Sequence, residues 1–411
     1  MRSWPPEPRR PHLSDIVSHD EKLDEALVTV FPSPNSFTGE DTVEISTHGG
    51  HLVPATVAAA LTLSGARQAL PGEFTRRAVL NGKLDVLQAE AIGDLIDARS
   101  HAMQKAALGQ LDGGLSNRLA ELRKQLLELE SLIAYDVDFP EEDDGPVAPA
   151  RIERATVVIL KSLSSLLATV PIGELVREGA LVVIAGPPNV GKSSLFNALL
   201  GRSRAIVTEI PGTTRDALEA VVDTGRWPIR LVDTAGLRDT DDQLEKLGIQ
   251  VSERYLSAAD LVLACADDTS ILRALTEAIA RHTEGPVIGV RTKADLVAEG
   301  DQIGESGSLW ISAHSGAGLS QLTKAIDRAI DSRQSFGVDA PMLTTARHRN
   351  AVETAYAEAA EFERVWREEK LPVTVAAVHL RTAVVALEEL VGSIEIEDVL
   401  DRVFSSFCVG K

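Results

Sequence analysis

Residues 186–193 of this 411-residue chain read Gly-Pro-Pro-Asn-Val-Gly-Lys-Ser, which is the spacing of a phosphate-binding loop. The apolar run 180–185 before the loop predicts a buried parallel strand, and residues 194–200 after it predict a helix. In this context the two glycines turn backbone N–H groups toward phosphate at a helix N-terminus. Lys192 is expected to neutralise the terminal phosphates, and the Ser193 hydroxyl to ligate magnesium. The alternative, a chance glycine-rich turn, is disfavoured by the flanking elements, so the predicted ligand is a nucleoside triphosphate.

Two further segments predict how magnesium and the terminal phosphate are held. The polar loop 212–216, Gly-Thr-Thr-Arg-Asp, offers the Thr214 hydroxyl and a backbone carbonyl to close over them. The apolar residues 229–232 predict a strand that delivers the segment Asp233-Thr234-Ala235-Gly236. The Asp233 carboxylate is expected to hold the water shell of magnesium, and the Gly236 N–H to meet the terminal phosphate.

Two segments predict guanine as the base. Residues 289–291 predict a strand before Thr292-Lys293-Ala294-Asp295, where the Asp295 carboxylate can accept two hydrogen bonds from the guanine edge. Adenine cannot donate that pair. Residues 309–311 precede Ser312-Ala313-His314, whose backbone N–H groups can meet the guanine carbonyl oxygen. Five elements in this order and spacing are typical of a guanine-nucleotide switch protein.

Two positions depart from the usual switch pattern. The base-reading segment begins with Thr292 instead of asparagine, which predicts at most a weaker affinity, with guanine selectivity kept through Asp295. Leu237 stands where many switch GTPases carry the glutamine that orients the attacking water. Leucine cannot orient water, so another group must do so and must offset the charge on the transferring phosphoryl group.

The chain resembles the MnmE (TrmE) family of tRNA-modification GTPases. The resemblance rests on the nucleotide segments above and on four more: Pro-Ser-Pro-Asn-Ser-Phe-Thr-Gly-Glu-Asp at 32–41, Pro-Gly-Glu-Phe at 71–74, Leu-Asn-Gly-Lys-Leu-Asp at 80–85 and the terminal Phe-Cys-Val-Gly-Lys at 407–411. These landmarks run from near residue 30 to the last residue.

The resemblance supplies the missing catalytic groups. In the family a potassium ion replaces the usual arginine finger, and the matching ligands here are Asn189 with Thr208, Ile210 and Thr213 of the loop 208–213. The family's water-orienting glutamate matches Glu245, which without the match is an ordinary solvated helix carboxylate. The GTP-binding residues then are Asn189, Val190, Gly191, Lys192, Ser193, Ser194, Thr208, Glu209, Ile210, Pro211, Gly212, Thr213, Thr214, Asp233, Thr234, Ala235, Gly236, Thr292, Lys293, Ala294, Asp295, Ser312, Ala313 and His314.

The resemblance also implies a reduced folate as one-carbon donor, 5-formyl- or 5,10-methylene-tetrahydrofolate. Glu44, Lys83 and Lys411 match the family's folate contacts, and a carboxylate suits the donor-rich pterin edge. Cys408 is either a packed thiol or a thiolate in the modification chemistry, and the shared motif favours the second interpretation. The start of the chain lacks the family's glycine-rich segment and Ile-Arg-x-Ser-Gly-like strand, which bears on folate affinity and on N-terminal dimerisation.

Composition bounds the class of protein. No apolar run approaches membrane-spanning length and the first residues lack a secretory signal, so we expect a cytoplasmic protein without a membrane. Cys265 and Cys408 have no disulfide or metal spacing, and Cys265 is expected to be a buried strand residue. A net charge of −20 repels nucleic acid on average. This charge favours tRNA binding shared with the family's flavin-dependent partner, an MnmG-type protein, and the family resemblance implies a homodimer.

Pattern changes along the chain predict the fold class and its domains. We expect a doubly wound P-loop GTPase domain at 176–332 inserted into a helical bundle formed by 84–175 and 333–411, after a small α/β folate-binding and dimerisation domain at 1–83. Short β-rich runs at 26–31 and 42–45 predict strands in the first domain, and Asp112-Gly113-Gly114 predicts a break between helices of the bundle. The implied function is a potassium-stimulated GTPase that drives addition of an aminomethyl-type group at C5 of wobble uridine. Two alternatives stay open, a ribosome-assembly GTPase and a nucleotide-binding scaffold without turnover.

Overall fold

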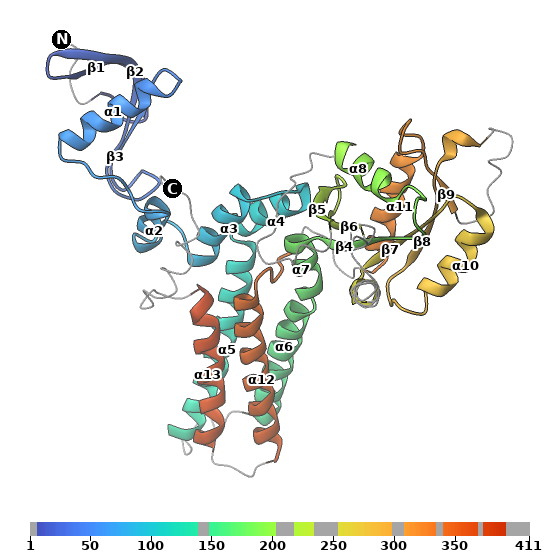
Figure 1. The fold of residues 1–411 in the computed structure, drawn as a ribbon. Helices are drawn as coiled ribbons and strands as arrows, with labels where there is room; N and C mark the ends of the chain where they lie inside the picture. The colour runs from blue at the N-terminus through green and yellow to red at the C-terminus, as the bar shows by residue number, and fades with distance from the viewer. Residues whose placement is uncertain are drawn as a thin grey trace, which may run out of the picture. The chain divides into compact units, whose positions relative to one another are not determined.

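The computed structural model describes residues 6–138, 148–202, 218–233, 254–297, 308–333, 340–368 and 373–391 (Figure 1). The chain divides into two compact units. One unit comprises residues 1–93, 111–120 and 387–411, and the other comprises 94–110 and 121–386.

The first unit begins with an antiparallel sheet of three strands in the order β1-β2-β3, namely β1 (His12–Ser18), β2 (Glu21–Phe31) and β3 (Thr42–Ser46). A two-residue turn at His19 and Asp20, both with positive φ, joins β1 to β2, as the twist of a tight hairpin favours. Alternation buries Ala26 and Val28 on one face of β2. Strands at 26–31 and 42–45 were predicted, and β1 is additional. Helices α1 (Leu52–Leu63) and α2 (Glu73–Leu80) lie in this unit, and α3 (Val86–Ile96) begins in it.

As predicted, helices occur in the sequence both before and after the strands of the nucleotide domain. Its helices are α4 (His101–Leu111), α5 (Gly114–Asp138), α6 (Pro149–Leu167), α7 (Val170–Glu178), α12 (Ala346–Glu368) and α13 (Val373–Val391). The break that Asp112-Gly113-Gly114 predicted lies between α4 and α5, and a second break, between Ile96 and His101, was not predicted. α5 buries Leu122, Leu126, Leu129 and Ile133 at the three- and four-residue spacing of one helical face. α6 packs against α12.

A six-stranded sheet forms the nucleotide domain in the order β5-β6-β4-β7-β8-β9. β4, β6, β7, β8 and β9 are parallel, and β5 pairs with β6 antiparallel at the edge. The strands are β4 (Ala180–Ala185), β5 (Leu218–Asp223), β6 (Pro228–Asp233), β7 (Leu261–Ala266), β8 (Val287–Arg291) and β9 (Ser308–Trp310). Helices α8 (Lys192–Arg202) and α10 (Thr269–Ile279) lie between strands in the sequence, and α11 (Leu319–Asp331) follows β9. The predicted doubly wound fold is confirmed.

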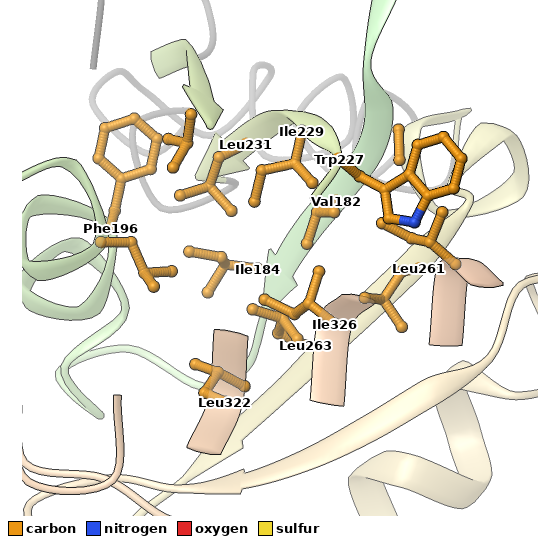
Figure 2. Close-up of a cluster of buried hydrophobic side chains, with 14 of the residues drawn as sticks. Val182, Ile184, Phe196, Trp227, Ile229, Leu231, Leu261, Leu263, Leu322 and Ile326 are labelled. Carbon is orange, nitrogen blue, oxygen red and sulfur yellow. The ribbon is translucent and has the colours of Figure 1, made fainter. Parts of the chain in front are cut away.

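Helices cover both faces of this sheet. On one face Ile184 and Leu263 lie in a buried cluster with Leu322 and Ile326 of α11 and with Phe196 of α8 (Figure 2). On the other face the cluster combines the alternate residues of β4 and β7 with apolar residues of α10. Because both faces are covered, β4 and β7 are buried along their whole length, as their unbroken apolar sequences predict.

One helical stretch, Pro149–Glu178, is long and apolar enough by composition to cross a membrane, with a mean hydropathy of 1.7 in its apolar window. Core helices of soluble proteins pass the same test, and 33% of this window is buried inside the protein. Ile152, Ile159 and Leu163 are buried residues of α6. Serine and charged residues interrupt this stretch, so the sequence contains no unbroken apolar run there.

Candidate nucleotide site and N-terminal motif cluster

The predicted nucleotide-binding segments meet at one edge of the six-stranded sheet. The phosphate loop follows β4, Asp233 ends β6, Thr292 follows β8 and Ser312 lies two residues after β9. These four strands are parallel, so their carboxyl ends share that edge. Open α/β sheets bind ligands at this edge, in the crevice beyond the carboxyl ends of the strands.

The phosphate loop packs tightly against the neighbouring strand. A Cβ at Gly186 lies 2.2 Å from the carbonyl oxygen of Cys265 on β7, so a side chain there displaces backbone. Cys265 is a buried strand residue, as predicted, and burial raises the pKa of its thiol to about 12. Asn189 and Gly191 both have positive φ, which bends the chain sharply before α8 begins at Lys192. The loop therefore leads directly into a helix N-terminus, where N–H groups lack intrahelical partners.

Lys192 is held within its own loop. Its Nζ donates to the carbonyl oxygen of Pro187 at 2.7 Å, and the residue is only 4% exposed. A buried ammonium requires oxygen partners. Phosphate oxygens can take that role from the carbonyl with stronger, charge-assisted hydrogen bonds.

The donor set for magnesium is present on two elements. The Ser193 hydroxyl, in the first turn of α8, lies 2.7 Å from Oδ2 of Asp233, the last residue of β6. Asp233 is fully buried and Ser193 is exposed. A hydroxyl and a carboxylate that converge at a helix N-terminus fit a magnesium ion that keeps most of its waters. The hydrogen bond between Ser193 and Asp233 fixes the direction of both side chains.

Thr292 joins the base-reading segment to the phosphate loop. Its hydroxyl lies 2.6 Å from the carbonyl oxygen of Val190 and 3.2 Å from that of Ala266. The Thr292 N–H also donates to Ala266, at 2.9 Å, and the side chain is buried. The hydroxyl that replaces the usual asparagine amide therefore contacts backbone of two neighbouring segments.

A side-chain hydrogen bond stabilises the ionised form of Asp295. Side-chain hydrogen bonding from Ser312 lowers the pKa of Asp295, with smaller contributions from its own backbone and from the charge of His314. Ser312 is buried, and its own N–H donates to the carbonyl oxygen of Ala317 at 3.1 Å. The backbone N–H groups of Ser312, Ala313 and His314 were predicted to meet the guanine carbonyl oxygen. In the structure the N–H of Ser312 donates its hydrogen bond within the turn 312–317 instead. The Ala294 N–H donates to Ile311, which fixes the segment against the end of β9.

The structure adds one residue that the sequence argument missed. Asp267 directly follows β7, and its carboxylate accepts a hydrogen bond from Lys293 Nζ at 2.8 Å. This hydrogen bond lowers the pKa of Asp267. An acidic residue at the carboxyl end of a buried parallel strand is the sequence signal that marks this position.

Several predicted site residues lie outside the described part of the chain. They are Thr208, Glu209, Ile210, Pro211, Gly212, Thr213 and Thr214, then Thr234, Ala235 and Gly236, and finally Glu245, Cys408 and Lys411.

In the first unit, two of the sequence segments that carry the family resemblance contact each other. Lys83 Nζ donates to the Pro34 carbonyl at 3.0 Å, and Asn81 Nδ2 donates to the Thr38 carbonyl at 2.7 Å. Gly39 approaches Asn81 so closely that a Cβ there lies 3.2 Å from the Asn81 side chain. These contacts seat the loop 32–41 against residues 80–85. Glu44, the predicted pterin ligand, is an exposed residue of β3.

Glu73 connects the 71–74 segment to the same loop. Its carboxylate accepts hydrogen bonds from Arg67 at 2.6 Å and from Arg77 at 2.7 Å, and also from the Leu70 N–H. Arg77 in turn binds Glu40 at 2.9 Å. The Arg67 guanidinium, the Leu70 amide and Arg77 together lower the pKa of Glu73 to about 2.

Known families agree with this architecture. A family model described as the MnmE helical domain matches residues 86–408, and one described as GTP-binding protein TrmE N-terminus matches residues 1–83. The tRNA modification GTPase MnmE of Moorella thermoacetica is 42% identical over 410 residues, which cover 97% of this chain and 88% of the relative. The protein of the same name from Methylobacterium radiotolerans is 42% identical over 412 residues, with 99% and 91% covered. That from Aquifex aeolicus is 38% identical over 411 residues, with 98% and 91% covered. The chain therefore belongs to the MnmE family of tRNA modification GTPases.

Proposed function

We propose that this chain hydrolyses GTP in a magnesium-dependent, potassium-stimulated cycle that drives modification of wobble uridine in tRNA. The observation that carries the nucleotide part is the convergence of Lys192, Ser193 and Asp233 at the sheet edge that also holds Thr292 and Asp295. The relatives named above carry the tRNA part.

The residues of the site divide the work. Lys192 exchanges the Pro187 carbonyl for phosphate oxygens, and the N-terminus of α8 adds backbone N–H donors. The Ser193 hydroxyl and, through water, the Asp233 carboxylate would hold magnesium. When bound, the metal neutralises charge that develops on the phosphate oxygens. Asp295, ionised because Ser312 stabilises its carboxylate, accepts the paired donors of guanine.

Two catalytic assignments rest on the family. Asn189 would contribute its side-chain oxygen to a potassium ion, and its exposed position in the left-handed turn of the loop is compatible with that role. Glu245 would orient the attacking water in place of the usual glutamine, because Leu237 occupies the position of that glutamine here. A Glu245→Ala variant should bind GTP normally and hydrolyse it slowly. An unchanged turnover rate removes Glu245 from the mechanism.

The modification itself would use three further components. A reduced folate supplies carbon and contacts Glu44, Lys83 and Lys411, an MnmG-type flavin protein acts as partner, and Cys408 takes part in the chemistry. The product is an aminomethyl or carboxymethylaminomethyl group at C5 of the uridine. The net charge of −20 supports tRNA binding that is shared with that partner. The family resemblance supports a homodimer, and we propose a cytoplasmic location. In this proposal residues 1–83 form the folate-binding domain, 84–175 and 333–411 form the helical domain, and 176–332 form the GTPase domain.

Phosphate release measured in potassium and then in sodium tests the GTPase part against its alternatives. Strong potassium dependence supports the proposed cycle. Release that is equal in both salts points to an ordinary GTPase such as a ribosome-assembly factor, and no release in either points to a scaffold.

Mass spectrometry of tRNA nucleosides tests the tRNA part. Cells without this gene should lose the modified wobble uridine and regain it with the wild-type gene. A Cys408→Ser gene should fail to restore the nucleoside although the purified variant still hydrolyses GTP. Full restoration by Cys408→Ser contradicts the role given to this thiol.

A further inference from the structure

A histidine that follows β3 is held by a carboxylate on the neighbouring strand. His48 comes two residues after the end of β3, at the start of the turn that leads into α1 (Figure 1). Its Nδ1 lies 2.7 Å from Oδ1 of Asp24 on β2, and its backbone N–H donates to Oδ2 of the same carboxylate at 2.9 Å. Asp24 therefore fixes both the backbone and the ring of His48.

The two partners differ in exposure and in what they do with a proton. The Asp24 side chain is 8% exposed, whereas the His48 side chain is 74% exposed. The hydrogen bond from the His48 backbone N–H is the main cause that lowers the pKa of Asp24, so its carboxylate is ionised near neutral pH and only accepts hydrogen bonds. Nδ1 then carries a hydrogen. This leaves Nε2 as the ring atom that gains or gives up a proton.

The surface beside the His48 ring is open. Within the described ranges Nε2 has no protein hydrogen-bond partner. A Cβ built at Gly49 or at Gly50 meets no atom within 4 Å. Gly50 has a positive φ of 105°, which favours glycine, but Gly49 has neither a positive φ nor a close neighbour that would require one. Two residues that lack a side chain therefore leave room for a ligand next to His48.

The position of His48 suits the folate of the proposed function, on which this inference rests. Glu44 is an exposed residue of β3, four positions before His48. At about 3.3 Å for each extended residue, the two Cα atoms are at most about 13 Å apart, so one molecule the size of a folate can reach both side chains. One short segment thus presents a carboxylate to the pterin edge and an imidazole to the nitrogens that carry the one-carbon group.

We propose that His48 is a catalytic residue of the one-carbon step, a general acid that Asp24 positions and that protonates the folate nitrogen from which the carbon departs. In 5,10-methylene-tetrahydrofolate the transferred carbon is bound to N5 and N10. His48 gives its Nε2 proton to N10 as the bond between N10 and the carbon breaks, and the electron pair of that bond stays on N10 while the N5 lone pair replaces it. The carbon is then open to attack, and the neutral His48 ring regains a proton from water.

A His48→Asn variant separates proton transfer from anchoring of the turn. The asparagine amide can still donate to Asp24 near the former position of Nδ1, and the backbone contact is kept, but the side chain cannot transfer a proton. The assay uses the full chain with its flavin-dependent partner, GTP, 5,10-methylene-tetrahydrofolate and unmodified tRNA. We expect His48→Asn to form the modified uridine about 100-fold more slowly than wild type, the usual contribution of a general acid. Its dissociation constant for the folate, measured by equilibrium dialysis, should equal that of wild type.

His379→Asn is the matched control. It removes a histidine whose Nδ1 also lies 2.7 Å from a carboxylate, that of Glu358, in the helical region. Because this pair lies between α12 and α13 and has no part in the proposed step, the variant should modify tRNA at the wild-type rate.

An Asp24→Asn variant tests positioning through His48. Its amide can donate as well as accept, so it no longer holds the ring in one tautomer, and we expect about tenfold slower modification. If Asp24 acts through His48, Asp24→Asn adds no further loss in the His48→Asn background. An equal loss in both backgrounds makes Asp24 a structural residue and overturns its part in the proposal.

Two results overturn the role of His48 as an acid. One is a His48→Asn protein that modifies tRNA at the wild-type rate. The other is a rate that falls only in proportion to folate affinity, which would make His48 a binding residue. A wild-type protein that binds no folate overturns the proposed use of folate instead, which is a separate outcome.

Discussion

The Thr292 hydroxyl lies 2.6 Å from the carbonyl oxygen of Val190, so the base-reading segment and the phosphate loop are joined by a direct hydrogen bond. Replacement by valine keeps the shape and removes the donor. We expect Thr292→Val to weaken GDP binding about tenfold, because a buried carbonyl loses a partner worth about 1–3 kcal/mol. Thr292→Ser keeps the hydroxyl and should stay close to wild type in the same titration. Equal affinities for valine and serine variants contradict this account of the asparagine replacement.

The pair Ser193 and Asp233 should control the magnesium requirement. In Ser193→Ala the hydroxyl ligand is lost, and we expect the magnesium concentration for half-maximal GTP hydrolysis to rise about tenfold, in line with the loss of one charge-assisted contact. Ser131→Ala provides a control, since that hydroxyl only donates to the Leu127 carbonyl within α5. A magnesium titration of phosphate release measures both variants. The same half-maximal concentration in all three proteins rules out Ser193 as a ligand.

Gly173 of α7 allows a close approach to the segment before α12. A Cβ at this position lies 2.0 Å from the Leu343 carbonyl oxygen, so Gly173→Ala forces backbone apart and should lower the free energy of unfolding by about 1–3 kcal/mol. Gly109 of α4 has no atom within 4 Å of a built Cβ, so Gly109→Ala should instead stabilise by about 0.5–1 kcal/mol through helix propensity. Thermal unfolding followed by circular dichroism measures the opposite signs. A stable Gly173→Ala protein contradicts the close contact.

Glu73 should contribute an acid-sensitive part of the stability of the first unit. Its pKa is about 2 in the folded chain against a usual 4.5, so its stabilisation is complete above pH 4.5 and is lost as the pH falls from 4.5 toward 2. Glu73→Gln removes the titrating group. Urea unfolding of wild type and Glu73→Gln between pH 2 and 6 should therefore show a smaller decline with acid in the variant. Parallel declines contradict the assignment of the low pKa to Glu73.

Local sequence was enough to locate the phosphate loop and the strands that end at the site. Residues 180–200 are consecutive, and their apolar spacing and glycines fix β4, the loop and the start of α8 without help from distant parts of the chain. The strands before Asp233 and Thr292 were predicted for the same reason. β1 and β5 were not predicted. The residues of β1 alternate between half-buried and exposed, which gives a weaker apolar pattern than that of a strand buried on both faces.

The sequence alone determined which residue types this protein brings to a nucleotide, because each motif is a short run whose chemistry follows from its own residues. Only the tertiary structure decided which of these residues contact each other. Thr292 and Val190 are separated by 102 positions, and Asp267 and Lys293 by 26. Their contacts exist because β4, β7 and β8 are parallel neighbours whose carboxyl ends share one edge, and no periodicity within a single segment records that neighbourhood.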